Sequence, residues 1–378
     1  MRGQWIGPYE STPGGSIAVN IDELPSCYEG TAYLHPLTTV TGPIPRSEVI
    51  FRTIDKRTDA FSFSTTLIFP LHPDTHDRAE WNDIKHLFAP DAIMSNRVDV
   101  TGRLEGGKLH LEWKNEVGSG KCSLLAASAV TPSALQGEAV SWEEFKRRAT
   151  GLAREERFIF RGQSKPWRLR TSFHRHGRSD LRRFLEQDIP QLHKVLSART
   201  RHLFDLRDPA QNASFLSLAQ HHGYPTPLLD WTHSPFVAAF FAFRGVPRGS
   251  TGRPNSDAKV RVHTFDLGRW TATAQQIPRV TSPLLHLTFV DVLAIENERL
   301  IPQQAVALIS TVDDIESYLE GREKNLNTHE EYLRAFDIPA SEREAVLTEL
   351  RYMGITAGSL FPGLDGACEE LRERSFPQ

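Results

Sequence analysis

The chain has 378 residues, more than a single hydrophobic core usually organises, so its length predicts two domains. Its 44 Lys and Arg residues nearly balance its 47 Asp and Glu residues, which gives no overall reason to expect a nucleic-acid or membrane-surface partner. Any anionic ligand must therefore be bound by a local site.

The three cysteines, Cys27, Cys122 and Cys368, lie far apart, and no histidine stands near them at metal-ligand spacing. This pattern favours neither a disulfide framework nor a metal site. The N-terminus lacks an apolar leader, and no stretch approaches the about 20 apolar residues that cross a bilayer. We therefore expect a soluble, cytoplasmic protein with no membrane partner.

Residues 1 to about 130 are predicted to form an all-β barrel or sandwich, because short runs of alternating or β-branched residues are separated by glycine turns. The predicted strands are Ser16–Ile21, Gly30–Leu34 and Ala60–Phe69, followed by a hairpin of Lys108–Trp113 and Cys122–Ala127. No catalytic constellation is found here. We expect this domain to act as a sensor that binds a partner or a trigger.

From about residue 140 to residue 378 the pattern predicts an α+β domain around a split mixed sheet. Ser141, with Glu144 three residues later, is typical of a capping box that opens a helix. Phe158–Phe160 is a short apolar strand, and Leu181–Leu206 is predicted to be one long helix that Pro209 ends. The segment from Phe215 to Ala242 then reads as helix, turn, strand, turn and helix.

Three motifs in this domain resemble the FRG domain family. They are Phe160-Arg161-Gly162-Gln163, then Gln220-His221-x-Gly223-x-Pro225-Thr226-x-Leu228-Leu229-Asp230-Trp231-Thr232-x-Ser234-Pro235, and finally Asn297-x-Arg299-Leu300-Ile301-x-Gln303. In the third motif Ala305 stands where the family usually has glycine, and Ala307 where it has phenylalanine. The resemblance extends from about residue 140 to the C-terminus and leaves the N-terminal domain unassigned.

The order of the motifs is also similar to that of ADP-ribosyltransferases, in which an Arg-Gly on the first strand binds NAD and a late strand carries a glutamate. This resemblance implies an NAD-dependent ADP-ribosyltransferase-like effector without a metal, and the family suggests a role in bacterial toxins or anti-phage defence. Arg161 would bind a phosphate or ribose hydroxyl, because its guanidinium offers a planar fork of donors. Gly162 would let the backbone approach the ligand.

The remaining residues of the predicted NAD site follow the same resemblance. Thr232 or Ser234 would cap a helix that starts near Phe236 and turns its amides toward an anion, and Trp231 would stack on a ring. Polar side chains at the ends of apolar elements complete the predicted site: Gln163, Gln220, His221, Asp230 and Gln303.

The catalytic prediction rests on Glu296-x-Glu298. Glu298 would stabilise the oxocarbenium-like charge as nicotinamide departs, and Glu296 would orient or deprotonate the acceptor. The acceptor, protein or nucleic acid, is left open. A Gly/Pro/Ser-rich loop, Val246–Asp257, is predicted to select it.

Two other functions remain open. A hydrolase or nuclease would use His221, His222 and Asp230 for proton transfer, although adjacent residues on a helix point about 100° apart. A module that binds a nucleotide or a partner without turnover would use the same cleft.

Overall fold

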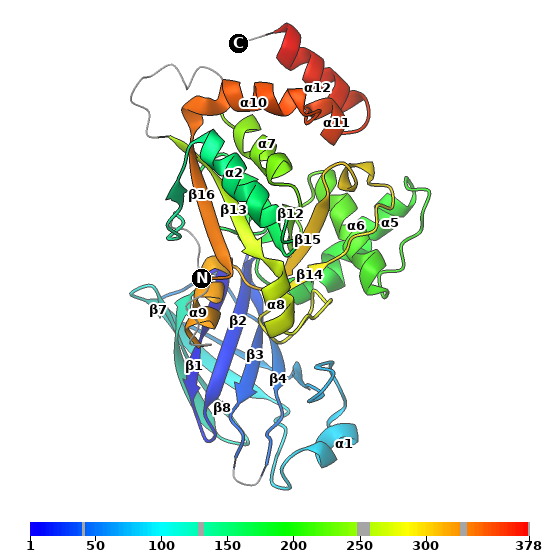
Figure 1. The fold of residues 1–378 in the computed structure, drawn as a ribbon. Coiled ribbons are helices and arrows are strands. Elements are labelled where there is room, and N and C mark those ends of the chain that lie inside the picture. The colour runs from blue at the N-terminus through cyan, green and yellow to red at the C-terminus, as the bar shows by residue number, and fades with distance from the viewer. Residues whose placement is uncertain (40–41, 128–131, 248–257, 326–330, 377–378) are drawn as a thin grey trace.

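The computed structural model describes residues 1–39, 42–127, 132–247, 258–325 and 331–376. These residues form two β-sheets, one in each half of the chain, and the chain is mixed α+β (Figure 1). The first sheet ends at Ala126 and the second begins at Glu138.

In the described part of the chain, the first sheet has nine antiparallel strands in the order β5-β7-β8-β9-β1-β2-β3-β4-β6. Its strands are β1 (Gly3–Glu10), β2 (Gly15–Glu23), β3 (Tyr28–Pro36), β4 (Ser47–Arg52), β5 (Phe61–Thr65), β6 (Ile68–Pro70), β7 (Val98–Glu105), β8 (Lys108–Asn115) and β9 (Ser119–Ala126). A short helix, α1 (Trp81–Ile84), and the turn η1 (Lys85–Leu87) interrupt it between β6 and β7. The predicted hairpin is confirmed as the β8–β9 pair.

The chain between Phe61 and Pro70 nearly closes this sheet into a barrel. The sequence predicted one strand over Ala60–Phe69, and this prediction is wrong. β5 pairs with β7 at one edge, whereas β6 pairs with β4 at the other. Between them, the Thr65 hydroxyl donates to the Ile50 carbonyl at 2.8 Å and the Ile50 amide donates to the Leu67 carbonyl at 2.9 Å. The apolar run is therefore divided between the two edges that it brings together.

Successive residues of strand β2 face alternately into the barrel and away from it. Ile17, Val19 and Ile21 are buried in the apolar interior of the barrel. Asn20 and Asp22 face the other way and are also buried, at 8% and 0% exposure. The outer face of this strand is therefore not open to solvent but covered by the second half of the chain, as Figure 1 shows for the strands beneath α8 and α9.

Buried polar contacts join the barrel to the second domain. The Asp22 carboxylate accepts hydrogen bonds from the Ser179 amide at 2.8 Å and from the Arg178 guanidinium. Gln4 of β1 donates to the Thr311 carbonyl at 2.8 Å and accepts from the Asp313 amide at 3.1 Å. Because these groups lose their contact with water, their pairing fixes one orientation of the barrel relative to the second sheet.

In the described residues, the second sheet has seven strands in the order β10-β16-β13-β11-β12-β15-β14. They are β10 (Glu138–Ala139), β11 (Phe158–Gln163), β12 (Leu228–Thr232), β13 (Lys259–Asp266), β14 (Leu287–Val290), β15 (Ala305–Ser310) and β16 (Leu333–Pro339). The sheet is mixed because β10 is parallel to β16 and the other pairs are antiparallel.

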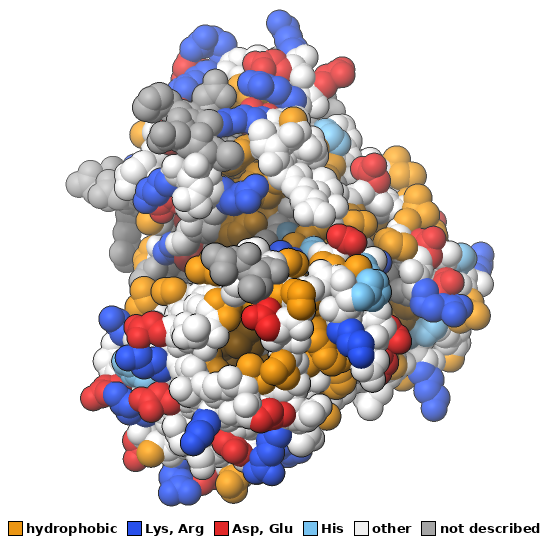
Figure 2. Space-filling view, turned by 90° about the horizontal axis from the view of Figure 1, so that it is seen from below, with side chains coloured by type: hydrophobic (Ala, Val, Ile, Leu, Met, Phe, Trp, Pro, Cys, Tyr) orange, Lys and Arg blue, Asp and Glu red, His pale blue; other side chains and the backbone are white. Residues whose placement is uncertain are grey.

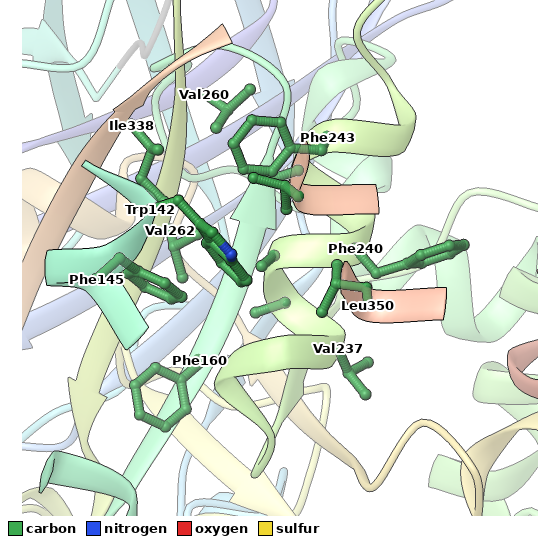
Figure 3. Packing of buried hydrophobic residues seen from close by; sticks show 14 of the residues in the cluster. Trp142, Phe145, Phe160, Val237, Phe240, Phe243, Val260, Val262, Ile338 and Leu350 are labelled. Atoms are coloured by element: carbon green, nitrogen blue, oxygen red, sulfur yellow. The ribbon is translucent and has the colours of Figure 1, made fainter. Parts of the chain in front are cut away.

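Helices cover both faces of the second sheet. One face carries α2 (Trp142–Ala153), α7 (Pro235–Arg244), α10 (Arg343–Tyr352) and α11 (Ala357–Leu360). Figure 3 shows the core beneath them, where aromatic side chains of α2 and α7 pack on Phe160 of β11 and on aliphatic residues of β13 and β16. Toward the other face and the ends of the sheet lie α3 (Ser172–Arg175), α6 (Pro209–His221), α8 (Leu267–Thr273) and α9 (Ile315–Asn325), and α12 (Leu364–Ser375) ends the described chain.

The helix predicted over Leu181–Leu206 is shorter than expected. The structure has α4 (Leu181–Arg183), a π-turn η2 (Phe184–Asp188) and α5 (Ile189–Ser197), and the helix ends there. Pro209 does not end a helix but begins α6, after the Asp208 side chain caps it. A proline is tolerated at the first helical position because its missing N–H has no partner there in any case.

At the start of α2, the Ser141 hydroxyl accepts from the Glu144 amide at 3.3 Å, as predicted. The reciprocal half of the capping box is missing, because the Glu144 carboxylate pairs with Arg147 at 2.7 Å instead.

Candidate functional site

The second sheet opens between β11 and β12. The two strands pair at one register position only, Phe160 opposite Thr232, whereas β11 pairs with β13 along its whole length. Beyond that position the Arg161 guanidinium reaches across the gap and donates to the Asp230 carbonyl. The opening therefore places side chains of both strands around one space.

A cavity of about 430 Å³ lies at this opening. Its walls come from β11, β12, the C-terminal turn of α6, the middle of α7 and the turn η4 (Glu298–Leu300) that precedes β15. A volume of this size falls in the range of about 300–1,000 Å³ that is usual for small-molecule sites. Residues from all three motifs line it: Arg161, Gln163, Gln220, His221, Asp230 and Gln303.

The cavity has an excess of positive charge. Arg161, Arg175 and Arg299 all line it, and among the described lining residues Asp230 supplies the sole carboxylate. Three guanidinium groups against one carboxylate favour an anionic ligand, because a forked donor matches phosphate or carboxylate oxygens. A chain of nearly zero net charge thus carries a locally cationic site.

Burial lowers the pKa of Arg161 to about 10, and Asp230 opposes this effect while Arg175 adds to it. Burial also lowers the pKa of Arg175, followed by repulsion from Arg170. The Arg161 group stays protonated at neutral pH. Each lowered pKa reports the cost of holding a cation here, a cost that an anionic ligand would offset.

The side chain of Gln220 holds the Asp230 carboxylate in place. Its carboxylate accepts a hydrogen bond from the Gln220 side-chain amide at 2.6 Å. The oxygen of that amide accepts from the Thr226 hydroxyl, which fixes the orientation of Gln220. One oxygen of Asp230 is therefore committed to Gln220 while the residue itself remains exposed in the cavity.

Four lining side chains each have a buried polar atom without a hydrogen-bond partner among the described residues. These atoms are Arg161 Nε, Gln163 Oε1, Trp231 Nε1 and Arg299 Nε. Buried polar atoms are rarely left unpaired in folded proteins, and an unfilled ligand site is one accepted reason for it. Four such atoms belong to residues around this one cavity, which makes it the candidate site.

Asn297, from the third motif, orients the His221 ring. Its Nδ1 lies 3.0 Å from the Asn297 side-chain oxygen, and the Asn297 amide donates to Ser217 at 3.3 Å. Nδ1 is therefore the protonated nitrogen and Nε2 keeps its lone pair. Burial, then repulsion from Arg299, lowers the pKa of His221, so the ring is neutral at pH 7.

Aromatic surface borders the same cavity. Trp167 lines it while 54% of the residue is exposed, and the Lys165 ammonium lies 6.0 Å from the centre of its ring. Phe361 also lines it, with the Arg299 guanidinium 5.0 Å from its ring centre. An exposed aromatic face beside cationic groups suits a ligand that joins a flat ring to an anion.

Not every predicted site residue lies in the cavity. Glu298 begins η4 and is exposed outside the lining, and the Glu296 carboxylate accepts from the Arg201 and His202 amides, at 2.5 and 2.9 Å. His222 is exposed, stacks on His221 at 4.6 Å and does not line the cavity. The role of Glu298 as the late glutamate stays a prediction, and it does not stand on a strand.

Other predicted residues have structural contacts as well. Ser234 caps α7 by accepting from the Val237 amide, and Thr232 donates to the Gln303 carbonyl at 2.7 Å. Gln303 itself donates to the Leu360 carbonyl at 2.9 Å. A Cβ at Gly162 would lie 1.8 Å from the Ala238 carbonyl, so close packing of α7 on β11 already requires a glycine there.

The FRG domain family model matches residues 156–249. The chain contains an FRG domain. The match runs from just before β11 through α7 and so includes Arg161, Gln220, His221 and Asp230, which confirms the resemblance read from the motifs. No curated protein and no solved structure matches this chain.

The third motif and the C-terminal segment that supply the opposite wall lie outside the residues matched by the FRG domain model. Sequence reasoning missed Trp167, Arg175 and Phe361, which belong to no motif. Asn297 and Arg299 were within a motif, and their position there was the signal that could have assigned them. Of the predicted acceptor loop Val246–Asp257, residues 248–257 lie outside the described part of the chain.

Within the described residues, no helix has the length and apolar character needed to span a membrane. The same residues hold no group of three or more His, Cys, Asp or Glu side chains that could bind a metal ion.

Proposed function

We propose that the FRG domain binds NAD in the cavity between β11 and β12 and transfers its ADP-ribosyl group. The observation that carries the proposal is the set of unpartnered polar atoms around a cavity with three guanidinium groups and one carboxylate. NAD contributes a pyrophosphate, two ribose rings and two flat bases. These groups match the cations, the polar atoms and the aromatic surfaces of the cavity.

In this proposal Arg161 and Arg175 bind the pyrophosphate, because both lie at the same end of the cavity, near Asp230. One base stacks on the exposed face of Trp167. Asp230 stands beside the ribose from which nicotinamide leaves.

The reaction breaks the bond between ribose C1′ and the nicotinamide nitrogen, and the electron pair leaves with nicotinamide. The ribose then carries oxocarbenium-like charge, which a nearby carboxylate stabilises. An acceptor hydroxyl, amine or water attacks C1′ and loses its proton. We assign the acceptance of that proton to Nε2 of the neutral His221 ring.

The carboxylate is assigned to Asp230 because it lines the cavity, whereas Glu298 and Glu296 lie outside the lining. Asp230→Asn keeps the shape and the Gln220 contact but removes the charge, so turnover should fall far more than NAD affinity. Glu298→Gln is the matched carboxylate-to-amide control. If Glu298→Gln abolishes turnover and Asp230→Asn does not, the sequence-based prediction for Glu298 is right and the assignment to Asp230 is wrong.

The test is to incubate the purified protein with NAD. Chromatography measures free nicotinamide, and mass spectrometry detects an added ADP-ribosyl group on the protein or on supplied acceptors. Nicotinamide release without an adduct would indicate hydrolysis to ADP-ribose rather than transfer to these acceptors.

A second candidate is a module that binds a nucleotide without turnover. It is favoured by the hydrogen bond that already occupies one oxygen of Asp230 and by the position of both glutamates outside the cavity. Calorimetry with NAD and with ADP-ribose distinguishes the two: binding of both with no nicotinamide release supports this second candidate. The acceptor, and a role in toxin or anti-phage defence, stay predictions from the family resemblance.

A further inference from the structure

The N-terminal barrel contains a second cavity, far from the FRG domain site in the fold. It has a volume of about 200 Å³ and lies among the inward-facing side chains of the strands. Among its described lining residues there is no Asp, Glu, Lys, Arg or His. Most of the lining side chains are aliphatic or aromatic, and the polar ones, Ser11, Thr12, Ser47, Ser95 and Asn115, are uncharged, so the cavity offers water few hydrogen-bond partners for its size.

The cavity is closed at one end and open at the other. At the end facing the FRG domain, Trp5 fills the barrel, and its indole donates to the Met1 carbonyl at 2.9 Å. The other end lies among the loop residues Pro13, Ile93 and Val117, which line the cavity. Figure 2 views the molecule from this end and shows a hollow bordered by hydrophobic side chains. A ligand can therefore enter without passing the domain interface.

Exposed apolar residues surround the opening. Ile93 and Val117 line the cavity and are 63% and 49% exposed, and Leu37, which follows β3 at the same end, is 65% exposed. Single exposed apolar residues are common, but several on separate loops around one opening form an entry surface.

We propose that the barrel interior binds a small, neutral, apolar molecule, about the size of one substituted ring or a short acyl chain. An apolar cavity of about 150 Å³ in another protein stays dry and takes up benzene, so about 200 Å³ admits a slightly larger guest. Barrels of about eight strands are wide enough to hold one small ligand. The lining has no cationic side chain to pair with an anionic guest, which favours a neutral one.

Among the polar residues that line the cavity, Tyr9 offers an anchor for a guest. The Tyr9 hydroxyl has no hydrogen-bond partner among the described residues, and burial raises the pKa of Tyr9 to about 12. The phenol therefore remains a donor at neutral pH. It suits a guest with one acceptor oxygen, such as an alcohol, ketone or ester.

The probes are toluene, 1-octanol and octanoate, each added to the full chain while thermal unfolding is followed. Toluene and 1-octanol should raise the melting temperature in a concentration-dependent way, because a ligand that binds only the folded state stabilises it. Octanoate, of the same length as octanol but charged, should have no effect. If neither neutral probe raises the melting temperature, or if octanoate and octanol act equally, the proposal is wrong.

Adjacent residues of β7 provide matched variants. Val100 lines the cavity and Thr101 is exposed on the outer surface. Val100→Phe fills the cavity and should weaken toluene binding at least about tenfold, whereas Thr101→Phe should leave it unchanged. Val100→Ala enlarges the cavity and should retain toluene binding. It tests the proposal if Val100→Phe does not fold. Equal toluene affinity in Val100→Phe and the wild type, or loss of binding in Val100→Ala, would overturn the proposal.

Discussion

Replacement of Arg161 by lysine distinguishes a ligand-binding arginine from one that only holds the sheet together. The Arg161 guanidinium donates to the Asp230 carbonyl across the gap between β11 and β12 and keeps Nε without a partner. Lysine retains the positive charge but loses the planar fork. The variant therefore has one expected effect on binding and a separate one on stability.

The two effects differ in size. A hydrogen bond to a charged group contributes about 1.5–3 kcal/mol, so the loss of one such bond to a phosphate weakens binding about 10- to 150-fold. The bond to the Asp230 carbonyl is a single contact of the same kind, and a lysine ammonium can also donate to a carbonyl, so folding stability should fall by less than about 3 kcal/mol. Arg161→Lys should thus lose most of its ligand affinity while remaining folded.

The assay is calorimetric titration with ADP-ribose, which lacks the scissile bond to nicotinamide, together with urea unfolding. Arg147→Lys is the matched control, because Arg147 is 73% exposed on α2 and pairs with Glu144 far from the cavity. It should change neither affinity nor stability by a measurable amount. If Arg161→Lys binds ADP-ribose within about threefold of the wild type but loses more than about 3 kcal/mol of stability, Arg161 supports the sheet and does not bind the ligand.

Gly162→Ala should destabilise the FRG domain by about 1–3 kcal/mol or more, because the new Cβ would lie 1.8 Å from the Ala238 carbonyl. Gly151→Ala in α2 is the control: its new Cβ meets nothing within 4 Å, so the variant should be neutral or stabilising, and urea unfolding measures both. Burial raises the pKa of Asp180 to about 6, so the folded state keeps a proton that the unfolded state has released, and the contribution of this carboxyl to stability falls as pH rises from about 4 to about 6. The advantage of Asp180→Asn over the wild type should therefore grow across that range by up to about 3 kcal/mol, and parallel stability curves would contradict this. Asp22→Asn at the interface between the barrel and the FRG domain should cost about 1–3 kcal/mol, since it removes a buried carboxylate that two half-buried arginines share, although Arg178 keeps Asp188 and Arg183 keeps Glu29; a loss below about 0.5 kcal/mol in urea unfolding would show that the interface tolerates an amide there.

Local patterns in the sequence determined the strands of the barrel and the segments around the main motif. Alternation in Ser16–Ile21 predicted a strand, and β2 contains it. The motif order predicted helix, strand and helix over α6, β12 and α7, because each apolar run there has its own cap or turn. Arg161, Gln220, His221 and Asp230 were predicted to share one cleft, and all four line one cavity.

Only the tertiary structure decided which residues lie beside these four and what the barrel encloses. Trp167, Arg175 and Phe361 reach the cavity from segments without a motif, and Glu298, the immediate neighbour of Arg299 in the chain, lies outside its lining. A sequence pattern with a short period fixes which face of an element is apolar, but pairing between distant strands fixes what that face meets. For the same reason alternation over Ser16–Ile21 predicted the strand β2, while the burial of Asp22 depends on the part of the chain that covers the outer face of the barrel.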